Sequence, residues 1–397
     1  MIEETPNNKI QVLIVTGTRA EFGLLEPVMV EALKSPFLEP KFLVTGIHTL
    51  STFGNTQEEI KIKGFPIAHT VTINESDDMT TALAKEITGI NEYLKNNKTD
   101  LVVVLGDRPE PLAASIAAAY LKIPVAHING GDVSGQGIDE FNRHAITRFS
   151  HFHFVSCAAN KKRVSALGEE KWRIFNVGAT GLDSLQKVNY LNLEELSLKY
   201  NLDTSQPWFL VLHHPTPLDQ TPFEDQIKPI LKATSKFNAE IFIIYPNSDT
   251  GHEIFTREIE NYANKPKFQI HKSLTRADYL SILKNFNVLI GNSSSGIIES
   301  SYYKIPTINI GNRQNGRACG INVINVDYDE KKIEKAIKKA ISKEFTILAK
   351  NAESPYGGGE VSKKIIRVIE KFAQDIKNNK DKIFFKNSPN VNKDNYV

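Results

Sequence analysis

The chain is dominated by short runs that are apolar from end to end and rich in β-branched residues. Ile10–Thr16 reads IQVLIVT, and Lys41–Thr45, Leu101–Leu105 and Val125–Ile128 are runs of the same kind. Each run is followed by a polar or glycine-bearing loop and then by a stretch with helical character. Runs without a polar face are typical of parallel strands that are covered on both sides. Strands that alternate with helices predict a doubly wound parallel sheet.

The same pattern starts again in the second half of the chain. It is found at Trp208–Leu212, Ile241–Tyr245, Asn287–Ile290 and Thr307–Ile310. A chain of 397 residues is also too long for one hydrophobic core of ordinary size. We therefore predict an α/β protein with two Rossmann-like domains, at residues 1–185 and 186–360, with polar residues 182–206 at the crossing.

The C-terminal part of the chain has a pattern of its own. Apolar residues recur at helical spacing from Val361 to Lys377, which predicts a helix over residues 361–378 that packs on either half. From Asn378 on, Asn and Lys dominate. Such a segment cannot bury enough apolar surface to offset the entropy of ordering it, so residues 379–397 are predicted to be a flexible polar tail.

Charge and cysteine content restrict the partners and the compartment. The chain has 48 Lys and Arg against 46 Asp and Glu, a formal charge of +2. This net charge is too small to attract nucleic acid or an anionic membrane. Cys157 and Cys319 are far apart and lack metal-type spacing, which argues against a disulfide or metal site. The first ten residues lack the basic and apolar run of a signal peptide, and stretches such as Leu112–Leu121 are too short to span a membrane. We predict a cytoplasmic protein.

In open α/β sheets, ligands bind outside the carboxyl ends of the strands, and polar side chains gather there in this sequence. Gly17–Glu21 follows the first strand, where a glycine, a helix start and Arg19 suit an anion. The alternative is a tight turn with a solvated arginine. The segment is not a GxGxxG fingerprint, so a nicotinamide cofactor is not indicated.

A second loop, Gly106–Glu110 (GDRPE), follows the strongly apolar strand at Leu101–Leu105. Pro109 fits the first helical position, which puts Asp107 near the N-cap and Glu110 in the first turn. Helix capping alone would explain Asp107. The two carboxylates could equally hold sugar hydroxyls or move a proton.

The densest group of polar residues follows the strand at Val125–Ile128. It contains His127, Asn129, Asp132, Asp139, Glu140, Arg143 and His144, with glycines between them. In a helix that begins after Gly137, Asp139 and Arg143 share one face, and Glu140 and His144 form a second pair with the same spacing. An exposed ion pair would need no function. The clustering of ionisable side chains beside a glycine-rich loop favours a functional site.

Loops of the second half carry a different set of groups. The residues are His213 and His214, Asn247 and Asp249, Ser293, Ser294 and Ser295, Glu299, Arg313 and Arg317. Three serine hydroxyls and backbone N–H groups at a helix start suit a diphosphate, although serines are also ordinary N-caps. Glu299, one helical turn in, could reach ribose hydroxyls or be a solvated helix residue. Neither a Walker GK[ST] nor a G-x-S-x-G segment is present, which argues against P-loop phosphoryl transfer and a serine-hydrolase elbow.

Taken together, these loops resemble the UDP-N-acetylglucosamine 2-epimerase family, in its hydrolysing branch of the sialic- and legionaminic-acid pathways. The resemblance spans about residues 10–375. The segments that carry it are GTRAEFGLL (Gly17–Leu25), GDRPEPLA (Gly106–Ala113), residues 126–154, HHP (His213–Pro215), YPNSD (Tyr245–Asp249), GNSSSGIIES (Gly291–Ser300) and PTINIGNRQNGR (Pro306–Arg317).

The resemblance implies a GT-B-like fold with a central cleft, a last helix that crosses back to the N-terminal domain, and a homo-oligomer (dimer or tetramer). It implies a nucleotide-sugar substrate and no metal or other cofactor. Ser293 and Ser294 would hold phosphates, Glu299 the ribose and Arg313 the diphosphate region. The implied catalytic residues are Asp107, Asp132, Asp139, Arg143 and His214. The implied substrate-binding residues are Arg19, Glu110, Asn129, His144, His213, Asn247, Asp249, Ser293, Ser294, Ser295, Glu299 and Arg313.

The implied reaction converts UDP-N-acetylglucosamine to N-acetylmannosamine and UDP. The diphosphate leaves C1, loss of the C2 proton gives a 2-acetamidoglucal, and hydration completes the reaction. This sequence departs from the sialic-acid type at Asn129, where a carboxylate is usual two residues after the histidine. An amide cannot be the proton-transfer base, so that role must fall to another residue, with Asp132 and Asp139 as candidates.

The departure at Asn129 leaves the sugar and the nucleotide base open, and three other classes of function remain as alternatives. The substrate could be GDP-N-acetylglucosamine or UDP-2,4-diacetamido-2,4,6-trideoxyglucose in the same reaction. A non-hydrolysing epimerase, a GT-B glycosyltransferase and a catalytically inactive sugar-nucleotide sensor are the alternatives from other classes of function.

Overall fold

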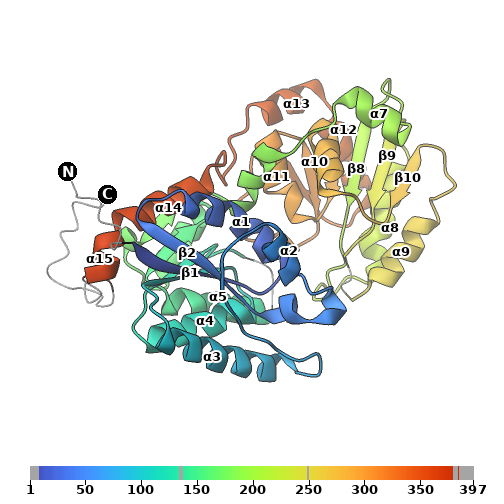
Figure 1. The fold of residues 1–397 in the computed structure, drawn as a ribbon. Helices are drawn as coiled ribbons and strands as arrows, with labels where there is room; N and C mark the ends of the chain where they lie inside the picture. Colours follow the sequence, from blue (N-terminus) through green and yellow to red (C-terminus); the bar gives the residue numbers. More distant parts are fainter. Residues whose placement is uncertain (1–8, 134–136, 248–249, 379–382, 384–397) are drawn as a thin grey trace. The chain divides into compact units, whose positions relative to one another are not determined.

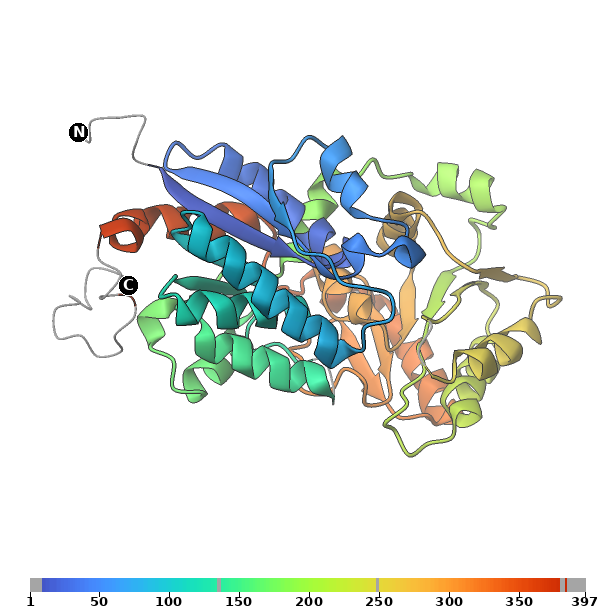
Figure 2. The same ribbon diagram turned by 60° about the horizontal axis from the view of Figure 1, so that its bottom comes forward.

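The computed structural model describes residues 9–133, 137–247, 250–378 and 383. The chain divides into two compact units (Figures 1 and 2). The first unit holds residues 1–132, 137–184 and 359–397, and the second holds residues 133–136 and 185–358. Each unit has its own sheet and its own cores. The predicted tail lies outside the described residues, apart from Ile383.

The first unit is built on a seven-stranded sheet in the order β3-β2-β1-β4-β5-β6-β7, with every pair of neighbours parallel. Its strands are β1 (Ile10–Thr16), β2 (Leu38–Val44), β3 (Ile67–Thr70), β4 (Leu101–Leu105), β5 (Val125–Ile128), β6 (Phe152–Val155) and β7 (Ile174–Asn176). All five residues of β4 are buried, as expected for a strand covered on both faces. The strand order reverses between β1 and β4, where doubly wound folds bind their ligands.

Helices cover both faces of this sheet. One core joins α1 (Arg19–Leu33), α2 (Gln57–Ile62), α14 (Val361–Lys371) and α15 (Ala373–Asn378) to alternate residues of the strands. The other core joins α3 (Met79–Asn96), α4 (Pro109–Tyr120) and α5 (Ile138–Phe149) to the remaining ones. Figure 2 turns the face with α3 and α4 toward the viewer. A further helix, α6 (Ala158–Ala166), contributes Val164 to a small cluster with Val155 and Ile174.

The C-terminal helix α14 packs on the first unit, beside α1 (Figure 1). Its apolar stripe, with Val361 and Ile365 fully buried, joins the core of that unit. Its first turn is held by Asp183, whose carboxylate accepts hydrogen bonds from the backbone N–H groups of Val361 and Ser362 at 2.7 Å each. The Ser362 hydroxyl also donates to this carboxylate, at 2.5 Å. A carboxylate at a helix N-terminus satisfies orphan donors and complements the helix dipole.

Replacing Asp183 with alanine is therefore expected to lower the free energy of unfolding by about 2 kcal/mol, because three hydrogen bonds to a buried carboxylate are lost together. Urea denaturation followed by circular dichroism measures this change. Glu353→Ala, at an exposed position, is the control and should change the free energy by less than about 0.5 kcal/mol. Equal stability of the two variants would show that Asp183 does not anchor α14.

The second unit repeats the architecture with a six-stranded parallel sheet in the order β10-β9-β8-β11-β12-β13. Its strands are β8 (Trp208–Leu212), β9 (Glu240–Ile244), β10 (Phe268–His271), β11 (Val288–Gly291), β12 (Thr307–Ile310) and β13 (Val323–Val326). Its helices are α7 (Leu193–Tyr200), α8 (Phe223–Thr234), α9 (His252–Glu260), α10 (Arg276–Asn285), α11 (Glu299–Tyr303), α12 (Glu330–Ala340) and α13 (Lys343–Lys350). Separate cores lie on the two faces of the sheet.

The predicted strands are all present, and the prediction of an α/β fold with parallel sheets is confirmed. Strands β3, β6, β7, β10 and β13 were not predicted from the sequence. They are three or four residues long, and β3, β6 and β10 each contain a histidine that interrupts the apolar pattern. The predicted C-terminal helix is interrupted at Phe372, which ends α14 before α15 begins. Among the described residues, no helix is both long and apolar enough to span a membrane.

Candidate active site

At the carboxyl edge of the first sheet, one buried arginine organises the loops after β4 and β5. Arg143 on α5 is only 1% exposed. Its guanidinium pairs with the Asp107 carboxylate and with Glu140 Oε1 at 2.8 Å, and it donates to the backbone oxygen of Asp132 at 2.9 Å. Burial opposes its charge, but Asp107 and Glu140 raise the pKa of Arg143 overall. Arg143 therefore stays a cation and fixes Asp107 in place.

The pairing of Asp107 with Arg143 rules out helix capping as its role. The N-cap of α4 is Arg108, whose side chain makes no capping hydrogen bond. The Asp107 side chain is 25% exposed, so it also remains accessible. Asp107 lies next to the N-cap, close to its predicted place, but it pairs with Arg143 instead of capping α4.

Asp139 lies on the first turn of α5, four residues before Arg143. Burial and the nearby Asp107 raise the pKa of Asp139, while Arg143 and Arg108 act in the opposite direction. A carboxyl group whose pKa is raised toward neutrality can both take up and return a proton. Asp107 and Asp139 thus form a pair of interacting carboxyl groups beside one fixed cation.

The loop after β5 holds two residues in different environments. The Asp132 carboxylate accepts hydrogen bonds from Ser156 Oγ at 2.9 Å and from the Asn160 side chain, which tie it to the start of α6. Asn129 has a φ of 66°, in the left-handed region that asparagine tolerates better than most residues. Its side-chain oxygen is buried without a hydrogen-bond partner among the described residues.

His127 supports this loop without being available for catalysis. Its Nε2 lies 2.7 Å from the Gly106 carbonyl oxygen, so Nε2 carries the proton, and Nδ1 then accepts from Thr147 Oγ1 at 3.2 Å. Complete burial lowers the pKa of His127 to about 3. The ring therefore stays neutral and holds the backbone one residue before Asp107.

The other predicted site residues of the first unit do not take part in the Arg143 interactions described above. Arg19 is largely exposed and pairs with Glu59 at 3.0 Å. His144 is exposed on α5. Glu110 is 3% exposed and is paired with Arg108, so it does not face solvent.

In the second unit, a buried asparagine connects the loops after β8, β11 and β12. Asn292 accepts a hydrogen bond from the His214 backbone N–H at 2.7 Å and donates to the His214 oxygen at 2.8 Å. Its own carbonyl oxygen accepts from Arg313 Nη1 at 3.2 Å and from Gln314 Nε2 at 2.7 Å. Sequence reasoning missed Asn292, although it directly precedes the serines in GNSSSG.

The two histidines of HHP have different surroundings. His214 Nδ1 accepts a hydrogen bond from the Asn247 backbone N–H at 3.0 Å, which leaves Nε2 as the protonated nitrogen of a neutral ring. His213 is 2% exposed and stacks on Phe255 with ring centroids 5.7 Å apart. Burial lowers the pKa of His213 well below its usual value, so it is a neutral packing residue. Asp249 lies outside the described residues.

The serine segment was predicted to lie at the start of a helix, and its local structure is different. Ser294–Gly296 forms a single 3-10 turn with Ser293 as its N-cap, and the following α11 has only five residues. Glu299 is the first residue of α11, not a residue one turn in. Burial raises its pKa, while Arg276 and the Ser295 hydroxyl act in the opposite direction. Ser294 and Ser295 remain partly exposed beside it.

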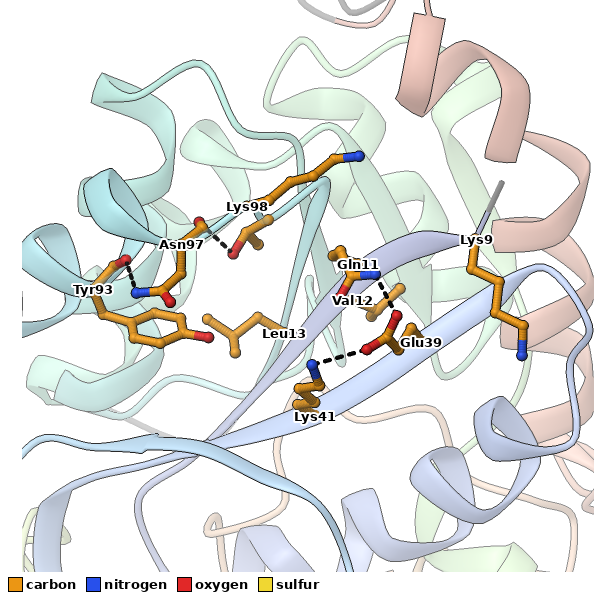
Figure 3. Close-up of a pocket in the computed structure, with 10 residues that line it drawn as sticks. Lys9, Gln11, Val12, Leu13, Glu39, Lys41, Tyr93, Asn97 and Lys98 are labelled. Atoms are coloured by element: carbon orange, nitrogen blue, oxygen red, sulfur yellow. Dashed lines mark hydrogen bonds and ion pairs between the residues drawn. The ribbon is translucent and has the colours of Figure 1, made fainter. Parts of the chain in front are cut away.

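A polar hollow of about 410 Å³ lies elsewhere, at the amino ends of β1 and β2 (Figure 3). Within it, Glu39 accepts from Gln11 at 2.6 Å and pairs with Lys41 at 2.9 Å. Ligands of open parallel sheets bind at the opposite, carboxyl ends of the strands. This hollow is therefore separate from the candidate site.

Comparison with known proteins decides the family. The family model described as UDP-N-acetylglucosamine 2-epimerase matches residues 31–370. The chain belongs to this family. The match covers most of both units and includes every described residue of the predicted site except Arg19.

Relatives of this 2-epimerase family are similar along most of the chain. A UDP-N,N'-diacetylbacillosamine 2-epimerase (hydrolyzing) from Legionella pneumophila is 35% identical over 364 residues, which cover 91% of this chain and 95% of the relative. The polysialic acid biosynthesis protein P7 of Escherichia coli is also 35% identical, over 91% of this chain and 94% of its own. These relatives confirm the predicted hydrolysing branch.

Solved structures of 2-epimerases share the fold. The UDP-GlcNAc 2-epimerase from Neisseria meningitidis, solved with UDP-GlcNAc bound, has a TM-score of 0.73 at 19% identity. The match covers 91% of this chain and 100% of that one. The predicted GT-B-like fold, with two Rossmann-like domains, is confirmed.

Proposed function

We propose that this 2-epimerase is a hydrolysing enzyme that converts UDP-N-acetylglucosamine to N-acetylmannosamine and UDP. The observation that carries the proposal is the carboxyl pair Asp107 and Asp139 beside the buried Arg143. Proton removal and return at a sugar carbon need two such groups, and a fixed cation keeps one of them in position. The Legionella relative, named as a hydrolyzing 2-epimerase of UDP-N,N'-diacetylbacillosamine, supports the hydrolytic course of the reaction.

The reaction balances without a further reagent. The bond between C1 and the diphosphate oxygen breaks, UDP leaves with the bonding electrons, and loss of the C2 proton gives a 2-acetamidoglucal. A proton then returns to the other face of C2, and water adds at C1. We assign proton transfer at C2 to Asp107 and Asp139, because Asn129 carries no carboxylate and Asp132 is tied to Ser156 and Asn160.

The second unit is proposed to bind the nucleotide. Asn292 holds the backbone of His214 and the guanidinium of Arg313 close to the serine turn at Ser294–Gly296. A guanidinium and a protonated imidazole nitrogen are suitable donors for departing diphosphate oxygens. Glu299 is proposed for the ribose. The cleft, the homo-oligomer and the cytoplasmic location stay predictions.

A second candidate substrate is UDP-2,4-diacetamido-2,4,6-trideoxyglucose. Two observations favour it: Asn129 replaces the carboxylate usual in the sialic-acid type, and the Legionella relative is named for that sugar nucleotide. The reaction at C1 and C2 would be the same. The difference would lie in recognition of the substituent at C4.

Separate incubations with UDP-GlcNAc, GDP-GlcNAc and the diacetamido analogue test the proposal, with products identified by chromatography and NMR. We expect free hexosamine and free nucleoside diphosphate, and the ratio of kcat/KM values identifies the substrate. An epimerised sugar still attached to its nucleotide would indicate a non-hydrolysing enzyme. Turnover that requires an added acceptor would indicate a glycosyltransferase, and binding without any product would indicate a sensor.

A further inference from the structure

Three glutamates from three different helices meet behind the candidate site in the first unit. Glu21 on α1, Glu86 on α3 and Glu110 on α4 are 5%, 1% and 3% exposed. None of them belongs to the proton-transfer pair proposed above. Each keeps one carboxyl oxygen that is buried without a hydrogen-bond partner among the described residues. Buried carboxyl groups in such numbers are costly unless they are neutral or paired.

The backbone is shaped to admit these groups. A Cβ atom added at Gly17 would lie 2.5 Å from Glu110 Cγ, and one added at Gly46 would lie 2.8 Å from it. The Gly17 N–H donates to Glu21 Oε2 at 2.9 Å, and the Thr45 hydroxyl lies 3.1 Å from Glu86 Oε1. Gly17 therefore makes room for Glu110 instead of for a ligand, which differs from the prediction for this loop.

The cation that pairs with the cluster is Arg108. Its Nε lies 3.3 Å from Glu110 Oε2, and Nη2 donates to Glu110 Oε1 at 3.3 Å. The Arg108 side chain is 43% exposed, so its guanidinium reaches from the cluster to the surface. Arg108 directly follows Asp107, and its charge acts on Asp139.

We propose that Glu21, Glu86 and Glu110 are positioning residues that hold the Arg108 guanidinium at the edge of the active site, with Glu110 as its ion-pair partner. This inference rests on the proposed function for its effect on the reaction. It assigns Glu110 a role behind the site instead of direct contact with substrate.

Charge balance in the cluster supports this arrangement. Burial, together with the nearby Glu110, raises the pKa of both Glu21 and Glu86 to about 8. At neutral pH the cluster then holds one carboxylate and one guanidinium. Above pH 8, three carboxylates would surround Arg108 and draw it inward, away from Asp139. The other groups near the cluster are His48, kept neutral by a pKa lowered to about 4 through burial, and the exposed pair of Arg19 and Glu59.

The stability of the protein tests the protonation of the cluster without any substrate. A carboxyl group whose pKa is higher in the folded protein stabilises it fully below the pKa of the unfolded chain, and this contribution is lost as pH rises toward 8. Glu86→Gln and Glu21→Gln mimic the neutral acid. Each should match the wild type in urea midpoint at pH 4, below the pKa of the unfolded carboxyl, and exceed it at pH 8.5. Glu92→Gln, at an exposed position of α3, is the control and should follow the wild type throughout.

Kinetics test the positioning role. In the wild type, kcat/KM should fall about tenfold between pH 7 and pH 9 as groups with a pKa near 8 ionise. Glu86→Gln should retain most of its pH 7 value at pH 9, whereas Glu92→Gln should show the wild-type loss. Glu110→Gln should lower kcat/KM at pH 7 and also reduce the pH dependence of stability, because its charge raises the pKa of its neighbours.

Each outcome decides either the protonation of the cluster or its role in positioning Arg108. If the glutamine variants at positions 21 and 86 follow Glu92→Gln in both stability and kinetics, the cluster proposal is overturned. A change in stability without a change in the kinetic profile would remove the positioning role and leave only a buried acid cluster. If the wild type turns over none of the sugar nucleotides, the proposed function fails, and the stability measurement alone decides the protonation of the cluster.

Discussion

Replacing Asp107 with asparagine is expected to lower kcat about a thousandfold, because the amide cannot accept the C2 proton. The amide still fills the same space and can accept one hydrogen bond from Arg143. Loss of the negative charge opposite the Arg143 guanidinium should lower the free energy of unfolding by about 2 kcal/mol. The measurements are initial rates of nucleotide release and urea denaturation of the same preparation.

Two controls separate chemistry from folding in this variant. Asp203→Asn changes an exposed carboxylate of the second unit and should leave both rate and stability near wild type. The affinity for UDP, measured by calorimetry, should change little in Asp107→Asn, because the nucleotide is assigned to the other unit. More than a tenth of the wild-type rate in the asparagine variant would contradict the role given to Asp107.

Replacing Arg143 with methionine should have the largest effect on stability. The guanidinium is buried and pairs with both Asp107 and Glu140, so its removal leaves two carboxylates without their cation. Breaking a buried pair on one side costs about 3–5 kcal/mol. Activity should also fall at least a thousandfold, because Asp107 loses the group that orients it.

A surface arginine provides the matched control for this variant. Arg257 is 62% exposed and pairs with Glu224 and Glu258, so Arg257→Met should change the free energy of unfolding by less than about 1 kcal/mol. Arg143→Lys should lose most of the activity as well, because an ammonium group cannot serve three acceptors in the geometry of the planar fork. A fully stable and active Arg143→Met variant would remove Arg143 from the centre of the site.

The sequence was sufficient to predict the architecture because the central strands are unusually clear. Runs such as Leu101–Leu105 are short and apolar throughout, as expected of a strand covered on both faces. The missed strand β6 shows the limit of this argument. His153 stands inside it and is fully buried because it pairs with Glu169, a residue from a later loop that the strand's own sequence does not indicate.

The candidate site was predicted as a set of residues, but not as a network. Asp107 and Arg143 were both candidates, yet their pairing joins residues 36 positions apart, which local spacing does not reveal. Glu110 was a candidate for substrate contact, and its burial depends on Gly17 and Gly46 from other loops. Glu86 gave no signal at all, since it reads as an ordinary helical residue of α3.

Solvent deuterium at C2 of the product tests directly whether the enzyme removes and returns the C2 proton. The protein is incubated with UDP-GlcNAc in D₂O, and the released hexosamine is examined by NMR, with the diacetamido analogue in parallel. Elimination followed by hydration predicts a free manno-configured sugar that carries deuterium at C2, together with free UDP. A sugar without deuterium at C2, or one still joined to its nucleotide, would contradict elimination and hydration as the reaction of this enzyme.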